Sequence, residues 1–145
     1  MDTKLDTYKT IDTLGKSQLD LIIQVYDGAL RSFERARTCY QTQDTESGYQ
    51  ELERAKRFLM HLYTTLDFER GGEVADRLGH LYAFTLNQIN LVEATHDLKQ
   101  LDKNVAVMRN LRDGWAGLKR QLPETEEGQS VSESMASAGQ FEASA

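Results

Sequence analysis

The chain has 145 residues, of which 39% are hydrophobic and 28% charged, as expected for a single soluble domain with one core. The net charge is −6 and no basic cluster stands out, so the composition gives no sign of a nucleic-acid partner. No apolar run reaches the roughly 18–20 residues of a membrane span, and the first ten residues lack a secretion signal. Cys39 has no second cysteine to pair with, so we expect a cytoplasmic protein.

The first half of the chain predicts two helices. Ser17 can cap the first, whose apolar residues recur at helical spacing from Leu19 to Tyr40. Asp44 can cap the second, which carries apolar residues up to Leu66. We expect this second helix to end at Gly71-Gly72, because paired glycines suit a helix end and a turn.

Two more helices are predicted in the second half. The third carries apolar residues from Val74 to Ile89, and Thr95 can cap a fourth that runs from Leu98 to Leu118 and stops before Pro123. No stretch alternates with a period of two over more than a few residues, so no strand is predicted. Because the connections are short, successive helices must be antiparallel. The expected fold is therefore all-α, an antiparallel up-down-up-down four-helix bundle over residues 17–122.

Two segments lie outside this predicted bundle. Residues 123–145 are rich in Ser, Glu, Gly and Ala and contain five glutamates but no Lys or Arg, which predicts a disordered acidic tail. Residues 1–16 form a polar N-terminal arm with Leu5, Tyr8, Ile11 and Leu14 at three-residue spacing. That spacing is enough for the arm to lie against a surface, although not for it to fold alone.

The first two helices carry more apolar surface than a bundle helix needs. At 100° per residue, the first has a core stripe and a second stripe on another side, and Ala29 joins the two. The second stripe begins with large residues and continues with small ones: Leu21, Val25, Gly28, Ser32, Ala36 and Cys39. The second helix is apolar over roughly 200° of its circumference, including Phe58 and Leu62. Exposed contiguous apolar surface usually marks a partner site.

Gly28 stands in the middle of this second stripe. A glycine inside a helix costs up to about 1 kcal/mol relative to alanine and leaves a notch in the helix surface. Packing inside a four-helix bundle supplies no evident reason for the notch, so we expect a helix of another protein to lie across it. The alternative is a tilted or kinked bundle that buries the same residues itself.

The sequence offers no catalytic or metal site. Glu-x-x-His occurs once, at Glu93–His96 in a predicted turn, whereas di-iron bundles need it twice. A glycine-rich phosphate loop is absent, and Cys39 has no obvious base beside it. We therefore expect no enzymatic activity, no cofactor and no metal.

Three segments resemble stretches of one known family. They are "VYDGALRSFERA" at 25–36, "LDFERGGEVADRLGHLYAF" at 66–84 and "LRDGW" at 111–115. In order, spacing and helix placement they resemble the flagellin-specific export chaperones, the FliS family, over about residues 8–118. Two departures are the absence of a proline after Ser17 and the polar Gln24 where the family favours an apolar residue.

The resemblance implies a cytoplasmic chaperone of bacterial flagellum biogenesis. Such a protein binds the C-terminal segment of flagellin in apolar grooves, prevents premature polymerisation and delivers its cargo to the flagellar type III export apparatus, without nucleotide. In this family the N-terminal arm is thought to cover part of the groove when no cargo is present. Mapped onto this chain, the flagellin groove comprises Tyr8, Ile11, Leu21, Val25, Gly28, Ala29, Ser32, Phe58 and Leu62.

A second interpretation comes from a different functional class. The extra apolar face could be a self-association surface, which would make the protein a structural oligomer of helical bundles. A homodimer that forms only in the absence of cargo is also left open. Light scattering on the pure protein distinguishes these cases, because a structural oligomer would bury the face at a symmetric contact.

Overall fold

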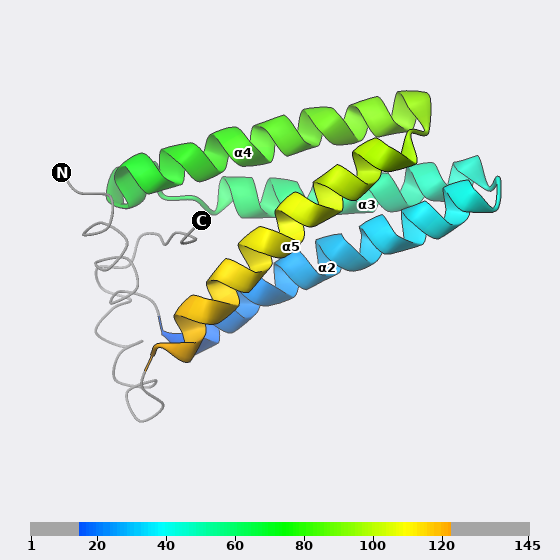
Figure 1. Cartoon of the computed structure of the whole chain (residues 1–145). Coiled ribbons are helices and arrows are strands. Elements are labelled where there is room, and N and C mark those ends of the chain that lie inside the picture. Colours follow the sequence, from blue (N-terminus) through cyan, green and yellow to red (C-terminus); the bar gives the residue numbers. More distant parts are fainter. Residues whose placement is uncertain (1–14, 123–145) are drawn as a thin grey trace.

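The computed structural model describes residues 15–122, which form four α-helices (Figure 1). They are α2 (Lys16–Gln41), α3 (Thr45–Thr64), α4 (Phe68–Thr95) and α5 (Leu98–Arg120), and this range contains no strand. Only two or three residues separate successive helices, so each helix must turn back along the one before it. The predicted antiparallel four-helix bundle is confirmed.

Each helix packs against two neighbours. α2 lies against α3 and α5, and α4 also lies against α3 and α5, so the helices follow one another around the bundle in chain order. Figure 1 shows α5 running obliquely from the end of α4 to the beginning of α2. The C-terminal end of α5 and the N-terminal end of α2 therefore lie at the same end of the molecule.

Ion pairs join α2 to α5 along much of their length. Arg37 holds Asp102 through two hydrogen bonds of 2.8 and 3.1 Å, and the Nε of Arg112 donates to Asp27 over 2.9 Å. Glu34–Arg109 and Asp20–Lys119 complete the series. Such solvent-screened pairs contribute little to stability, so their main effect is to fix how α5 lies on α2.

Three aromatic side chains from three helices meet in the core. Tyr26 of α2, Tyr82 of α4 and Trp115 of α5 are at most 1% exposed. The indole Nε1 of Trp115 donates to the Tyr26 hydroxyl over 3.0 Å, and that hydroxyl also bonds to the Tyr82 hydroxyl. Burial raises the pKa of Tyr26 to about 12, so its hydroxyl stays protonated and can serve both partners.

Aspartates begin three of the helices. Asp44 accepts from the Ser47 backbone N–H over 3.2 Å, which confirms the predicted cap of α3. The predicted cap at Ser17 is wrong, because α2 begins at Lys16 after Gly15 and no side chain caps it. Ser17 lies inside the first turn of α2 and is exposed.

The predicted helix end at Gly71-Gly72 is also wrong. α3 ends at Thr64, and Asp67 caps α4 by accepting from the backbone N–H groups of Glu69 and Arg70 over 3.1 and 3.0 Å. Gly72 has φ 55° and ψ −132°, a conformation that glycine adopts readily, and it interrupts α4 with a kink. The paired glycines therefore bend a helix near its start.

Thr95 does not cap the last helix as predicted. It is the final residue of α4, and its hydroxyl donates to the carbonyl of Leu91 over 2.8 Å. His96 follows in the left-handed region with φ 58°, and Asp97 caps α5 by accepting from the N–H groups of Lys99 and Gln100 over 2.9 and 3.3 Å.

Candidate partner-binding groove

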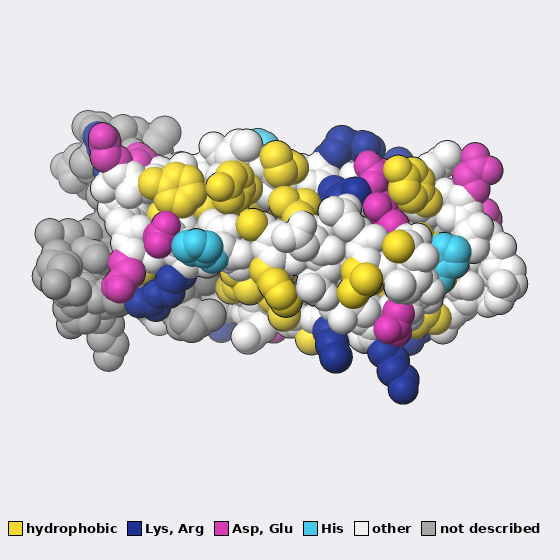
Figure 2. Space-filling view, turned by 90° about the horizontal axis from the view of Figure 1, so that it is seen from above, with side chains coloured by type: hydrophobic (Ala, Val, Ile, Leu, Met, Phe, Trp, Pro, Cys, Tyr) yellow, Lys and Arg dark blue, Asp and Glu magenta, His cyan; other side chains and the backbone are white. Residues whose placement is uncertain are grey.

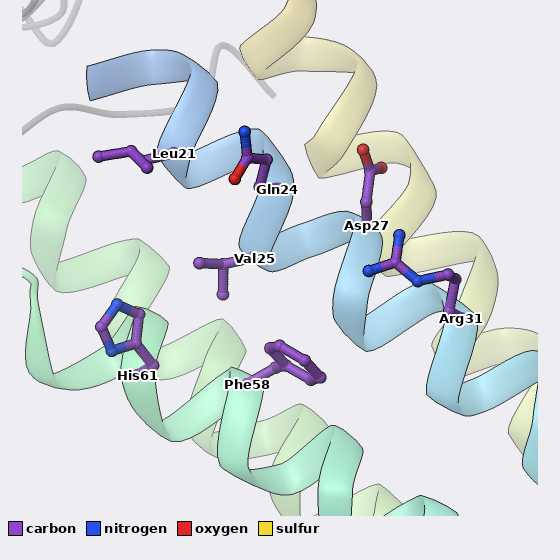
Figure 3. A pocket seen from close by; sticks show the side chains of 7 residues that line it. All are labelled: Leu21, Gln24, Val25, Asp27, Arg31, Phe58 and His61. Atoms are coloured by element: carbon purple, nitrogen blue, oxygen red, sulfur yellow. The ribbon is translucent and has the colours of Figure 1, made fainter. Parts of the chain in front are cut away.

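A pocket of about 540 Å³ lies between α2 and α3, and we call it the α2–α3 groove. Its lining consists of Leu21, Gln24, Val25, Asp27 and Arg31 of α2 with Phe58 and His61 of α3. In Figure 3, Leu21 and Val25 extend from α2 toward the side of α3, from which Phe58 and His61 approach. Three of the residues predicted for the groove are thus brought together: Leu21, Val25 and Phe58.

The apolar part of the groove follows from helical spacing. Leu21 and Val25 are four residues apart on α2, and Phe58 and His61 are three apart on α3, so each pair lies on one face of its helix. Leu21 is 61% exposed, and Val25 and Phe58 are half-buried. Covering such side chains would remove a substantial apolar area from water, worth about 1.5–3 kcal/mol for a fully buried leucine.

Gly28 is buried against the ring of Phe58, a residue that lines the groove. A Cβ built on Gly28 would lie 2.5 Å from Cε1 and 2.6 Å from Cζ of Phe58. The expectation that packing inside the bundle gives no reason for this glycine is wrong, because an aromatic ring of α3 fills the notch. The reason is geometric: the small side of α2 faces its own neighbour α3.

Three other predicted groove residues are buried inside the bundle. Ala29, Ser32 and Leu62 are 0%, 1% and 3% exposed and are not among the residues that line the groove. Much of the second apolar stripe of α2 is therefore used between α2 and α3. A bundle helix contacts two neighbours, which requires a wider apolar arc than contact with one. Tyr8 and Ile11 lie outside the described residues.

The polar lining of the groove was not among the predicted residues. Gln24, Arg31 and His61 stand one helical turn after Leu21, Gly28 and Phe58, respectively, and Asp27 stands one turn from both Gln24 and Arg31. That spacing could have identified them in the sequence. Asp27 is held by Arg112 of α5, a hydrogen bond that raises the pKa of the guanidinium above its usual value.

Large apolar side chains are also exposed away from the groove. Phe84 and Leu91 of α4 are 58% and 47% exposed, and Met60 of α3 is 46% exposed. At the beginning of α4, Phe68 packs edge-on against Tyr63, with ring centroids 6.1 Å apart. Figure 2, which looks down on the α4 side, shows apolar side chains at several places along this face, separated by polar ones.

A partly buried polar cluster joins α3 to α4. The ammonium Nζ of Lys56 lies 2.5 Å from Glu53, 3.1 Å from Glu93 and 2.8 Å from the side-chain oxygen of Asn90. Burial, and then a hydrogen bond with Glu53, raises the pKa of Glu93 to about 7. The pKa of Glu53 is lowered by its hydrogen bonds to Glu93 and Lys56. The two carboxyl groups thus compete for one cation.

Within residues 15–122, His, Cys, Asp and Glu side chains form no group of three that could hold a metal ion. His96, the histidine of the single Glu-x-x-His, instead stacks on Tyr40 with ring centroids 4.9 Å apart. None of the four described helices combines the length and hydropathy needed to cross a bilayer.

Comparison with known proteins identifies the family. The family described as "Flagellar protein FliS" matches residues 1–122, which include all four helices and the α2–α3 groove. The flagellar secretion chaperone FliS of Campylobacter jejuni is 29% identical over 100 residues, covering 69% of this chain and 78% of the relative. The Vibrio cholerae protein of the same name is 25% identical over 119 residues, covering 79% and 88% of the two chains. That of Salmonella typhimurium is 25% identical over 103 residues, covering 70% and 76%. The chain therefore belongs to the FliS family of flagellar secretion chaperones.

Proposed function

We propose that this protein is a cytoplasmic holdase for flagellin. It binds the C-terminal segment of flagellin, keeps that segment from polymerising too early and delivers it to the flagellar export apparatus. Membership of the FliS family supports the chaperone role. The observation that carries the site is the α2–α3 groove, where Leu21, Val25 and Phe58 border a pocket of about 540 Å³.

The groove is suited to binding without chemistry. Its contacts are apolar side chains between two helices, and such surfaces receive the apolar face of a peptide helix. Several apolar contacts are needed, because ordering a peptide segment opposes binding by a few kcal/mol. Gly28 becomes accessible to the cargo if the Phe58 ring turns outward, since that ring covers the glycine. Tyr8 and Ile11 would cover the groove when it is empty.

The test compares two exposed leucines. Leu21→Gln changes the groove, whereas Leu91→Gln changes a leucine of similar exposure on α4, 47% against 61%. Titration calorimetry with a peptide of the flagellin C-terminal segment measures both. We expect Leu21→Gln to weaken binding by about tenfold, equivalent to about 1.4 kcal/mol, and Leu91→Gln to leave it unchanged.

Two results would contradict this assignment. Equal weakening by both variants would show that the α2–α3 groove is not the binding site. A wild-type protein that does not bind the peptide, and that light scattering shows to be a dimer disrupted by Leu21→Gln, would favour the structural oligomer.

A further inference from the structure

Three arginines that have no carboxylate partner within residues 15–122 flank the α2–α3 groove. Arg31 lines the pocket, Arg35 follows it one turn later on α2, and Arg54 precedes Phe58 by one turn on α3. All three are exposed, and none forms an ion pair within residues 15–122. Of the nearby carboxylates, Asp27 is already bonded to Arg112. Glu34 is paired with Arg109, and Glu51 stands one turn before Arg54, so among the described residues the arginines here outnumber the carboxylates that lack an ion pair.

The chain carries a segment of opposite charge. Residues 123–145 contain five glutamates, Glu124, Glu126, Glu127, Glu133 and Glu142, and no lysine or arginine. Three apolar residues, Val131, Met135 and Phe141, are spread among them. The segment thus combines carboxylates for the arginines with apolar side chains for the pocket.

The end of α5, from which this segment continues, lies beside the start of α2. Lys119, close to the end of α5, is paired with Asp20 near the start of α2. From Asp20, Arg31 is 11 residues along α2, or about 16 Å at 1.5 Å per residue, and the chain must also cross one helix of about 10–12 Å. A random coil of 23 residues would have an r.m.s. span of about 24–29 Å, which is comparable to the distance to be covered.

We propose that the acidic segment 123–145 docks in cis on the arginine-flanked side of the α2–α3 groove. Its glutamates pair with Arg31, Arg35 and Arg54, and its apolar residues contact the arginine-flanked end of the pocket, beside the part that Tyr8 and Ile11 are proposed to cover. Because the segment is tethered, its effective concentration at the groove is in the millimolar range, so weak contacts suffice. Docking does not require flagellin. Its consequence, competition with cargo for the groove, rests on the proposed function.

The test follows the segment in the full chain by paramagnetic relaxation. In a Cys39→Ser, Ser134→Cys protein, a nitroxide attached at residue 134 should broaden the amide signals of residues 21–35 and 54–61 more than those of the rest of the bundle. The broadening should fall several-fold between 0.1 and 1 M salt, because the Debye length shortens from about 10 to about 3 Å.

Matched variants separate docking from chance proximity. Changing Arg31, Arg35 and Arg54 together to Gln should abolish the selective broadening, as should changing the five glutamates to Gln. The control changes Arg70, Lys99 and Lys103 to Gln, which removes the same charge from exposed positions elsewhere, and it should leave the broadening intact.

Broadening spread evenly over the bundle, or broadening that persists after the Arg31, Arg35 and Arg54 substitutions, would overturn the proposal. So would broadening in a mixture of isotope-labelled chains without nitroxide and unlabelled chains with it, because that contact would be between two copies. Flagellin affinity is measured separately on the same variants. Docking without flagellin binding refutes the proposed function alone, and flagellin binding without docking refutes this inference alone.

Discussion

Gly28 and Phe58 form a pair of residues that only three-dimensional structure reveals. The glycine gives up helix propensity, and the half-buried phenylalanine occupies the space above it. The ring also borders the groove, so its position determines how much of the pocket is open. One contact between two helices thus affects both packing and the proposed binding surface.

Gly28→Ala should therefore affect binding more than stability. The added Cβ would lie 2.5 Å from the Phe58 ring and force it toward the pocket. The helix gains up to about 1 kcal/mol from the alanine, while lost ring packing offsets much of that gain. We expect a free energy of unfolding within about 1 kcal/mol of wild type and several-fold weaker binding of the flagellin peptide, measured by urea unfolding and calorimetry.

Gly117→Ala on α5 is the matched control. Its added Cβ would meet nothing closer than the end of Arg120 at 3.7 Å. It should raise the free energy of unfolding by about 0.5–1 kcal/mol and leave binding unchanged. If both variants behave alike in the two measurements, the Phe58 ring does not regulate the pocket.

Helix boundaries in this protein depend on aspartate caps. The sequence predicted the cap at Asp44 because that residue follows a polar break and precedes an apolar stripe. It misplaced the next two boundaries because other signals stood close by. Gly71-Gly72 lies within five residues of Asp67, and Thr95 lies two residues before Asp97. A carboxylate that accepts two backbone N–H groups satisfies a helix start better than one hydroxyl.

The polar cluster between α3 and α4 predicts a pH dependence. The pKa of Glu93 is raised from an ordinary 4.5 to about 7 in the folded protein, so between these values the folded chain holds a proton that the unfolded chain has lost. Its contribution to stability is therefore present at low pH and is lost as pH rises toward 7. The lowered pKa of Glu53 has the opposite effect on stability: its contribution is lost as pH falls below 4.5.

Glu93→Gln imitates the protonated carboxyl and should remove the loss of stability that wild type shows as pH rises. Relative to wild type, the variant should gain stability between pH 5 and 8, on the order of 1–3 kcal/mol, as measured by urea unfolding at several pH values. The exposed Glu34→Gln serves as the comparison. A stability difference between wild type and Glu93→Gln that does not vary with pH would refute the raised pKa.

At the scale of the whole molecule, the helix order, the antiparallel topology and the core stripe of α2 could be predicted from apolar spacing and short connections. The surface that the second apolar stripe of α2 contacts could not be predicted. A helical wheel shows how wide an apolar arc is, but not whether the arc faces a neighbour in the same chain or a partner. Here Ala29, Ser32 and Leu62 face the bundle, while Leu21 remains 61% exposed.

The N-terminal arm gives a further prediction at this scale. If Tyr8 and Ile11 cover the groove, Tyr8→Ser with Ile11→Ser should increase the binding of an apolar fluorescent dye, with no loss of helix by circular dichroism. The control Lys9→Ser with Thr10→Ser changes neighbouring polar residues and should have no effect. Unchanged dye binding in the Tyr8 and Ile11 variant would show that the arm does not cover apolar surface.

Trp115 gives the protein an intrinsic optical probe of bundle opening. It is the chain's single tryptophan, it is fully buried, and its hydrogen bond to Tyr26 connects α5 to α2. A ligand that occupies only the α2–α3 groove leaves this indole dry, so its emission stays at short wavelength. A ligand that must part the helices to reach Ala29 or Leu62 lets water approach the indole and shifts its emission to longer wavelength. The emission wavelength of Trp115 can thus distinguish a ligand bound at the groove surface from one inserted between the helices.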